Sequence, residues 1–359
     1  MSSSCHALEV FGPIKDTHYS CPNNSDPMKF TDNKAVTQND DSEEIVISTE
    51  STFDDECLDI PGNGWSSRNS IQLDGSSVSF ESKVTHTKYQ TITYRPDTLL
   101  DGWATDYCTI RAASLRGTSH RCFGQPRQDD LTIKVRDDLP AIIITVADGV
   151  SNASHSHIAS TVATRYISQR LCKRESFLEA PINWDELMRD ASDAIVDHMS
   201  SLSTDMSKKL CDIHALVATT IISAVIYPSQ INLGSLSAEV CCVGDSGAWI
   251  LQEGRILPIL GGKQKVGHLI YDEATDCLPQ PRPKPSIKRL EISKDSVFLI
   301  GTDGFGDPLG DGTCQVGRLY SSVLSRRIPS IIEFGHMLDF TLATFFDDRT
   351  LVAVWPNFE

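Results

Sequence analysis

Short apolar runs recur along the chain after about residue 88, and most of them have the length of a strand. Residues 142–146 are all β-branched and almost all aliphatic, which predicts a buried strand that ends at Asp148-Gly149. Similar runs predict further strands over 109–113, 131–135, 215–227, 238–243, 248–251, 296–302 and 351–355. Apolar residues at helical spacing predict helices over 158–167, over 184–199 with Asn183 as the cap, and over 331–345.

The spacing between these strands indicates how they pair. A turn over 137–140 would join 131–135 and 142–147 as a hairpin. Strands 238–243 and 248–251 are separated by too few residues for a crossover helix, which parallel neighbours would need. The pattern therefore predicts an α+β protein built from antiparallel sheets, not a doubly wound parallel sheet.

Two other segments have no strong periodicity. Residues 1–85 hold fifteen acidic and five basic side chains and few apolar ones, so we expect a mostly disordered, dispensable leader before a domain over 86–359. Within that domain, alternation over 89–94 predicts a strand. The Pro- and Gly-rich stretch 261–285 predicts a mobile surface loop.

Composition narrows the class of protein. The net charge of −16 over 359 residues argues against binding to nucleic acid or to an anionic membrane. No apolar run approaches the roughly 20 residues of a membrane span, and the first residues do not have the pattern of a signal peptide. The eleven cysteines are scattered without a C-x-x-C pair, which indicates reduced thiols. We expect a cytoplasmic monomer.

Acidic residues stand at the ends of the predicted strands. They are Asp129, Asp148, Asp245, Asp303 and Asp347. Each one alone is also explained as a turn residue, but five in one domain are better explained by convergence. Converging carboxylates repel one another unless cations neutralise them. Oxygen ligands with no His or Cys nearby select Mg²⁺ or Mn²⁺, and two such ions can bind a phosphoryl group and activate a water.

The motifs around these acids resemble those of a known family. Gln128-Asp129, 146–149, 243–246, 302–304 and 347–350 follow one another in the order and approximate spacing of the metal-dependent protein phosphatases (PPM, type 2C), most closely divergent bacterial members. The resemblance covers about residues 108–356. It implies a four-layer sandwich of two antiparallel sheets flanked by helices. It also implies hydrolysis of phosphoserine and phosphothreonine in protein substrates by a metal-activated water.

The resemblance also implies roles for the acids. Asp148 would bridge two Mg²⁺ or Mn²⁺ ions, with the Gly149 carbonyl on the second ion. Asp303 and Asp347 would complete the first ion's ligands, and Asp129 would hold metal-bound water. Asp245 matches the acid of a third, weaker metal site. We take Asp347 as the ligand because the family has Ser or Thr three residues later, here Thr350, so replacing Asp348 with Asn should be mild.

Two departures from the family bear on catalysis. The family's phosphate-binding arginine is replaced by Gly124, although Arg121 and Arg127 lie on either side and could substitute. Gly247 stands where the family has an arginine after Gly-Asp-Ser. An alternative is therefore a catalytically weak or inactive phosphatase-like module that binds or regulates another protein.

Three local patterns allow other readings. Residues 244–247, Gly-Asp-Ser-Gly, match the nucleophile motif of trypsin-like proteases, but Ala248-Trp249 and the absence of the partner motifs disfavour it. Asp307 and Asp311 invite a calcium-loop interpretation without the required spacing, so we expect a turn-rich loop. His155 and His157 are typical of solvated loop histidines, with proton donation by one of them as the alternative.

Overall fold

The computed structural model describes most of the chain after residue 94 and a few residues before it. Described are residues 71–73, 83–86, 89, 95–136, 138–202, 213, 216–231, 234–262, 265–266, 269–270, 276–342 and 344–357. Residues 1–70 and 74–82 of the predicted leader and 90–94 of the predicted strand lie outside this set. The domain boundary near residue 85 therefore remains a prediction.

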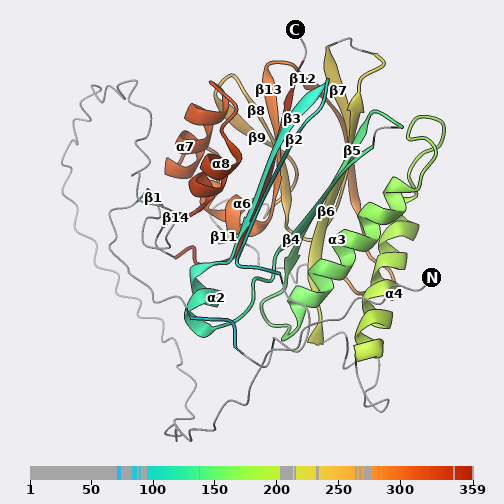
Figure 1. Cartoon of the computed structure of the whole chain (residues 1–359), viewed down its shortest axis with the longest axis vertical. Helices are drawn as coiled ribbons and strands as arrows, with labels where there is room; N and C mark the ends of the chain where they lie inside the picture. Colours follow the sequence, from blue (N-terminus) through green and yellow to red (C-terminus); the bar gives the residue numbers. More distant parts are fainter. Residues whose placement is uncertain are drawn as a thin grey trace, which may run out of the picture. The chain divides into compact units, whose positions relative to one another are not determined.

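Two antiparallel sheets face each other in the described chain (Figure 1). The five-stranded sheet has the order β12-β7-β6-β5-β4, and the six-stranded sheet has the order β2-β3-β15-β13-β8-β9. The first contains β4 (Asp130–Arg136), β5 (Ala141–Gly149), β6 (Thr219–Pro228), β7 (Ser235–Val243) and β12 (Ser286–Ser293). The second contains β2 (Thr98–Ala104), β3 (Cys108–Leu115), β8 (Gly247–Gln252), β9 (Arg255–Gly261), β13 (Ser296–Gly301) and β15 (Arg349–Pro356).

The apolar run of β5 is continuous because both faces of this strand are buried. Ile142, Ile144 and Val146 point between the sheets, where they meet side chains of the six-stranded sheet such as Ile110. Ile143 and its neighbours on the other face pack under helices. A strand covered on both sides reads as an unbroken aliphatic stretch, which is what the sequence has here.

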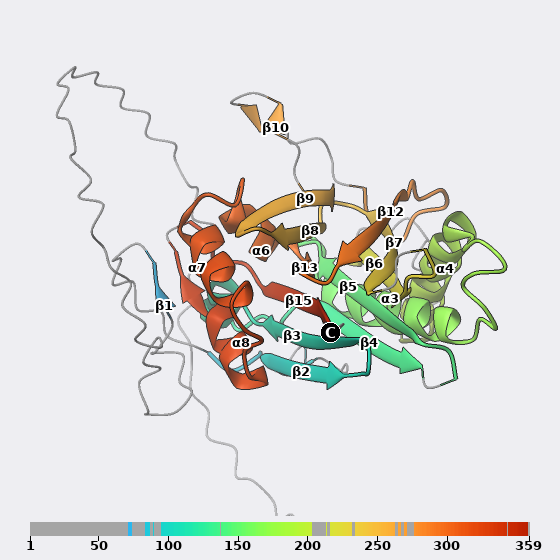
Figure 2. The same ribbon diagram turned by 90° about the horizontal axis from the view of Figure 1, so that it is seen from above.

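Helices cover the outer face of each sheet (Figure 2). Over the five-stranded sheet lie α3 (Ser156–Cys172) and α4 (Trp184–Leu202). Over the six-stranded sheet lie α6 (Asp303–Leu309), α7 (Gln315–Leu324) and α8 (Ile331–Leu338). This arrangement confirms the predicted α+β sandwich of two antiparallel sheets between helical layers. Among the described residues, no helix is long and apolar enough to cross a membrane.

The remaining elements are short. β1 (Ile71–Gln72) pairs in parallel with β14 (Phe340–Thr341), and β10 (Lys265–Val266) pairs with β11 (Leu269–Ile270). Helix α2 (Thr118–Phe123) precedes β4. Residues 83–86 run beside α2, because the Lys83 and His86 amides donate to the carbonyls of Arg121 and Gly124 at 2.9 and 2.8 Å.

Several predicted boundaries were wrong. The helix expected over 331–345 ends at Leu338, because Phe340 leaves it to pack in the core under the Arg349 guanidinium, 3.9 Å from the ring centroid. Within the loop expected over 261–285, Leu278 is buried and exchanges two backbone hydrogen bonds with Thr219, both 2.8 Å. Asp307 lies in α6 instead of a turn-rich loop.

Candidate metal centre

The topology places all five candidate acids at one end of the sandwich. Asp148, Asp245 and Asp303 follow or close β5, β7 and β13. Asp129 and Asp347 lie just before β4 and β15 begin. Because β4 is antiparallel to β5 and β15 is antiparallel to β13, the starts of β4 and β15 adjoin the ends of their partners. Strand ends that are distant in sequence therefore meet.

Three of these acids form a compact group. One carboxylate oxygen from each of Asp148, Asp245 and Asp303 lies within 4.8 Å of the other two. Burial, and then repulsion from Asp303, Asp129 and Asp347, raises the pKa of Asp148 well above its usual value. Such a group is costly while metal-free and becomes favourable when a cation neutralises it. Oxygen ligands in this number suit a hard divalent cation.

Asp347 belongs to a second group beside the first. Its carboxylate lies within 4.8 Å of ligand atoms of His120 and Asp348. Burial, followed by repulsion from Asp348 and Asp303, raises the pKa of Asp347 to about 6. One of its oxygens accepts a hydrogen bond of 2.8 Å from the Asp348 amide. Repulsion from Asp303 also places Asp347 within the field of the first group.

Asp348 differs sharply from Asp347. It is 2% exposed, and its oxygens accept the amide hydrogens of Gly117 and Gln128, both at 2.5 Å. His120 Nδ1 lies 2.8 Å from the same carboxylate. Although burial would raise it, His120 and the two amides hold the pKa of Asp348 below its usual value. Its oxygens therefore serve the fold, which leaves Asp347 as the better candidate ligand.

Asp129 is held by two hydroxyls. Its Oδ2 accepts hydrogen bonds from Thr302 (2.9 Å) and Thr350 (2.7 Å), and the side chain is 1% exposed. Its Oδ1 is buried without a hydrogen-bond partner. A buried carboxylate oxygen with no partner is rare and marks a place for a water or an ion. The orientation of Asp129 therefore fits a role at a metal centre.

Gly149 permits the close approach of two neighbouring segments. A Cβ at this position would lie 2.9 Å from atoms of both Gln128 and Ser156. Any larger residue would push α3 and the turn before β4 away from the end of β5. This contact explains the glycine by itself, and a metal contact for its carbonyl remains a prediction.

Neither flanking arginine is free in the structure. Arg127 is 1% exposed, donates to the Ser114 carbonyl at 2.9 Å, and lies 3.9 Å from Asp130. Arg121 lies on α2 with Nη1 3.5 Å from Asp339. Gly124 ends α2 at φ +65°, and a Cβ there would approach the Val84 carbonyl at 3.1 Å. A side chain at position 124 would therefore be strained.

The prediction of a site without nearby histidine was wrong. His120 is 5% exposed and lies against Asp348, on a helix too short to have a periodic signal. The expectation of solvated loop histidines also fails for His157, which is buried in α3. Burial, with a smaller effect of His155, lowers the pKa of His157 to about 4. His157 is therefore neutral near pH 7 and a poor proton donor.

The protease interpretation also does not fit. Ser246 is fully buried, and its hydroxyl lies 3.0 Å from that of Thr220. A serine nucleophile has to be accessible to substrate and paired with a base.

The seven described cysteines are free, as expected.

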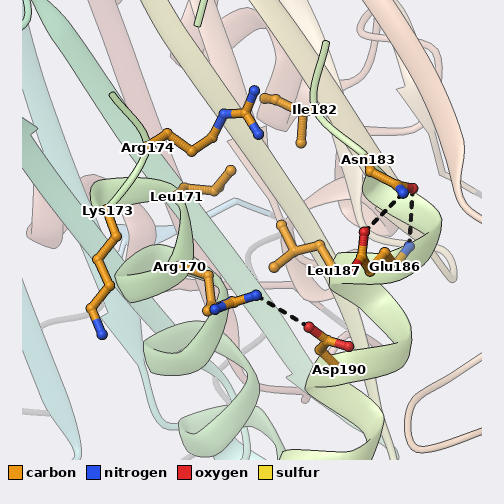
Figure 3. A pocket seen from close by; sticks show the side chains of 9 residues that line it. All are labelled: Arg170, Leu171, Lys173, Arg174, Ile182, Asn183, Glu186, Leu187 and Asp190. Atoms are coloured by element: carbon orange, nitrogen blue, oxygen red, sulfur yellow. Dashed lines mark hydrogen bonds and ion pairs between the residues drawn. The ribbon is translucent and has the colours of Figure 1, made fainter. Parts of the chain in front are cut away.

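A cavity of about 270 Å³ lies between the end of α3 and the start of α4 (Figure 3). It is lined by six polar or charged residues, of which Arg170 and Asp190 form an ion pair at 3.4 Å, and by three apolar residues. None of the candidate metal ligands borders it. α3 spans 17 residues, or about 25 Å, and the candidate centre lies near its other end. We therefore assign the chemistry to the acidic groups.

Comparison with known proteins agrees with this geometry. A family model described as "Protein phosphatase 2C" matches residues 116–330. No curated protein sequence matches the chain. A bacterial serine phosphatase has a similar structure, at 17% identity and a TM-score of 0.52, over 70% of this chain and 98% of that one.

Two further solved structures are less similar. One is the S. agalactiae serine/threonine phosphatase, at 16% identity and a TM-score of 0.49, over 69% of this chain and 99% of that one. The other is RsbX in complex with magnesium, at 17% identity and a TM-score of 0.44, over 72% of this chain and 100% of that one. At such identities these likenesses concern the fold.

Proposed function

Since the chain belongs to the protein phosphatase 2C family, we propose that it is a metal-dependent protein serine/threonine phosphatase. Its substrates would be proteins that carry phosphoserine or phosphothreonine. The observation that carries this proposal is the convergence of Asp148, Asp245 and Asp303 within 4.8 Å, at the end of the sandwich where Asp129 and Asp347 also lie. Their mutual repulsion is the property expected of a centre that binds divalent cations.

We assign the following roles to the residues of the proposed centre. Asp148 would contact two Mg²⁺ or Mn²⁺ ions, with Asp303 and Asp347 on one ion and the Gly149 carbonyl on the other. Bound cations supply an activated water and neutralise charge on the phosphoryl oxygens. Asp129, whose Oδ1 has no hydrogen-bond partner, would orient water at the centre. Asp245 would serve a third, weaker site.

Arg121 is the better candidate for binding the phosphoryl group. It lies on α2, the helix that also places His120 beside Asp348, and its side chain is 14% exposed. Arg127 is fully enclosed and already donates to Ser114. Arg121 would have to exchange its contact with Asp339 for the substrate, which is possible because that contact is long, at 3.5 Å.

A phosphatase-like module with weak or no turnover is the second candidate. The observation in its favour is that Gly124 replaces the family's arginine and that both flanking arginines are paired. Retention of all five acids opposes it, because a binding module gains nothing from five mutually repelling carboxylates.

Turnover of a small aryl phosphate, with Mn²⁺ and then with chelator, separates the two candidates. We expect metal-dependent hydrolysis by the parent protein and also release of phosphate from phosphoserine or phosphothreonine peptides. Asp148→Asn should lower turnover by orders of magnitude, because one carboxylate serves both ions. Asp197→Asn, at an exposed position of α4, is the matched control and should keep full activity. The proposal fails if no phosphopeptide is hydrolysed with Mn²⁺, or if Asp148→Asn stays fully active.

A further inference from the structure

Three segments that carry candidate residues of the proposed site meet at the Asp348 carboxylate. Gln128, whose amide donates to it, directly precedes Asp129 in the chain. Gly117, whose amide also donates to it, precedes α2, which carries Arg121. Asp348 itself follows Asp347. A single buried side chain thus ties together the turn before β4, the start of α2 and the start of β15.

The backbones at this junction are in direct contact. A Cβ on Gly117 would lie 2.2 Å from the Asp347 carbonyl carbon, and a Cβ on Gly304 would lie 1.8 Å from the Asp348 carbonyl oxygen. The backbone of Asp347 therefore lies against Gly117, just before α2, and the backbone of Asp348 lies against Gly304 at the start of α6. A shift of Asp348 would move Asp347 with it, because the Asp348 amide also binds the Asp347 carboxylate at 2.8 Å.

His120 is the only side chain that contacts this carboxylate among the described interactions. It lies 2.8 Å from Oδ1 through Nδ1 and is itself buried. Without His120, this buried carboxylate beside Asp347 and Asp129 would have only the two backbone amides as close polar partners among the described contacts, which is a costly arrangement. The histidine therefore supports the carboxylate that the two amides orient.

We propose that His120 and Asp348 act as a positioning pair, which fixes Asp347 and Asp129 in the geometry for metal binding without contacting the ions. This inference rests on the metal centre proposed above. It also changes the expectation that Asp348→Asn is mild. Each oxygen accepts from one backbone amide, so an amide nitrogen in place of either oxygen would face an N–H donor.

The alternative is that His120 binds a metal ion directly, since a ring nitrogen lies within 4.8 Å of both Asp347 and Asp348. The two roles use different atoms. A positioning role needs a donor at the place of Nδ1, whereas a ligand that keeps its contact with Asp348 would have to use Nε2. The amide nitrogen of Asn falls near the place of Nδ1 and leaves nothing near Nε2. His120→Asn therefore separates positioning from ligation.

The experiment is calorimetric titration of the metal-free full-length chain with Mn²⁺. We expect His120→Ala and Asp348→Asn to raise the Kd for Mn²⁺ by about 10- to 100-fold, the usual effect of removing a residue that orients metal ligands. His120→Asn should stay within about threefold of the parent. His198→Asn, at an exposed position of α4, is the control and should not change the Kd. At saturating Mn²⁺, the His120→Ala effect on aryl phosphate turnover should appear in kcat more than in KM.

The outcomes are distinct. The inference is overturned if the Kd for Mn²⁺ is unchanged in both His120→Ala and Asp348→Asn. It is also overturned if these variants only lower the melting temperature. In either case the proposed phosphatase activity still stands. Equal losses in His120→Asn and His120→Ala overturn it in favour of direct ligation. If the parent binds Mn²⁺ with the expected dependence on His120 but hydrolyses nothing, the inference holds and the proposed function fails. A parent that binds no Mn²⁺ overturns both. Should Asp348→Asn not fold, the His120 variants still decide.

Discussion

Replacement of Asp347 by Asn should make the metal-free protein more stable near neutral pH. Burial and the neighbouring acids raise the pKa of Asp347 from 3.8 to about 6. Between about pH 4 and pH 6 the folded state therefore binds more protons at this site than the unfolded state, so stability falls as pH rises through that window. A pKa raised from 3.8 to about 6, at about 1.4 kcal/mol for each tenfold change in the binding constant of the proton, corresponds to about 3 kcal/mol of lost stability at pH 7 and above. The side-chain amide of Asn does not ionise, so it does not lower the stability of the folded state in this way.

Urea unfolding of chelator-treated protein measures this difference. We expect the free energy of unfolding of Asp347→Asn to exceed that of the parent by about 3 kcal/mol at about pH 7.5, and by much less at about pH 4.5. Mn²⁺ should cancel most of this difference, because a ligand at 100 times its Kd adds about 2.7 kcal/mol to the parent, and the variant has lost a ligand. Asp197→Asn is the control. A metal-free Asp347→Asn protein that is less stable than the parent at about pH 7.5, or a gain equal at both pH values, would refute the reasoning.

Further predictions concern the arginines and the leader. Arg127→Ala should lower the free energy of unfolding by about 1–3 kcal/mol, because it removes the donor to the Ser114 carbonyl, while Asp130 keeps Arg95 at 3.0 Å. Arg121→Ala should cost at most about 1 kcal/mol but raise KM for phosphopeptides, so a raised KM in Arg127→Ala alone would contradict the assignment. Removing residues 1–70 should leave the melting temperature within a few degrees. Contrary to the expectation that all of 1–85 is dispensable, removing residues 1–86 should lower the melting temperature, since the hydrogen bonds of 83–86 to α2 are then lost.

The sheets and the location of the acids could be predicted from sequence because both depend on local patterns. Runs such as 142–146 have the β-branched character of a strand buried on both faces, and the structure buries them there. Short connections enforce antiparallel pairing, which brings the end of one strand next to the start of its partner. Acids at strand ends then converge without any further information.

Helix α2 and its histidine could not be predicted in this way. The helix has six residues, too few for a periodic signal, and its conformation depends on partners far along the chain. Gly117 binds a carboxylate 231 residues later. The end of α8 was missed for a related reason. Apolar residues continue past Asp339, but tertiary packing of Phe340 against Arg349 overrides the local preference for helix.

The motif Asp347-Asp348-Arg349-Thr350 gives each of its residues a different task. Spacing to Thr350 indicated Asp347 as the ligand, and the contacts supply a physical reason. Thr350 donates to Asp129 Oδ2, and Ser114 lies 2.6 Å from the Thr350 hydroxyl. Because Thr350 gives its only hydroxyl hydrogen to Asp129, Ser114 has to be the donor of that second bond. The oxygens of Asp348 accept hydrogen bonds from backbone amides and so stabilise the fold. The first and last residues of the motif therefore serve the proposed centre, while the two between them hold the chain in place.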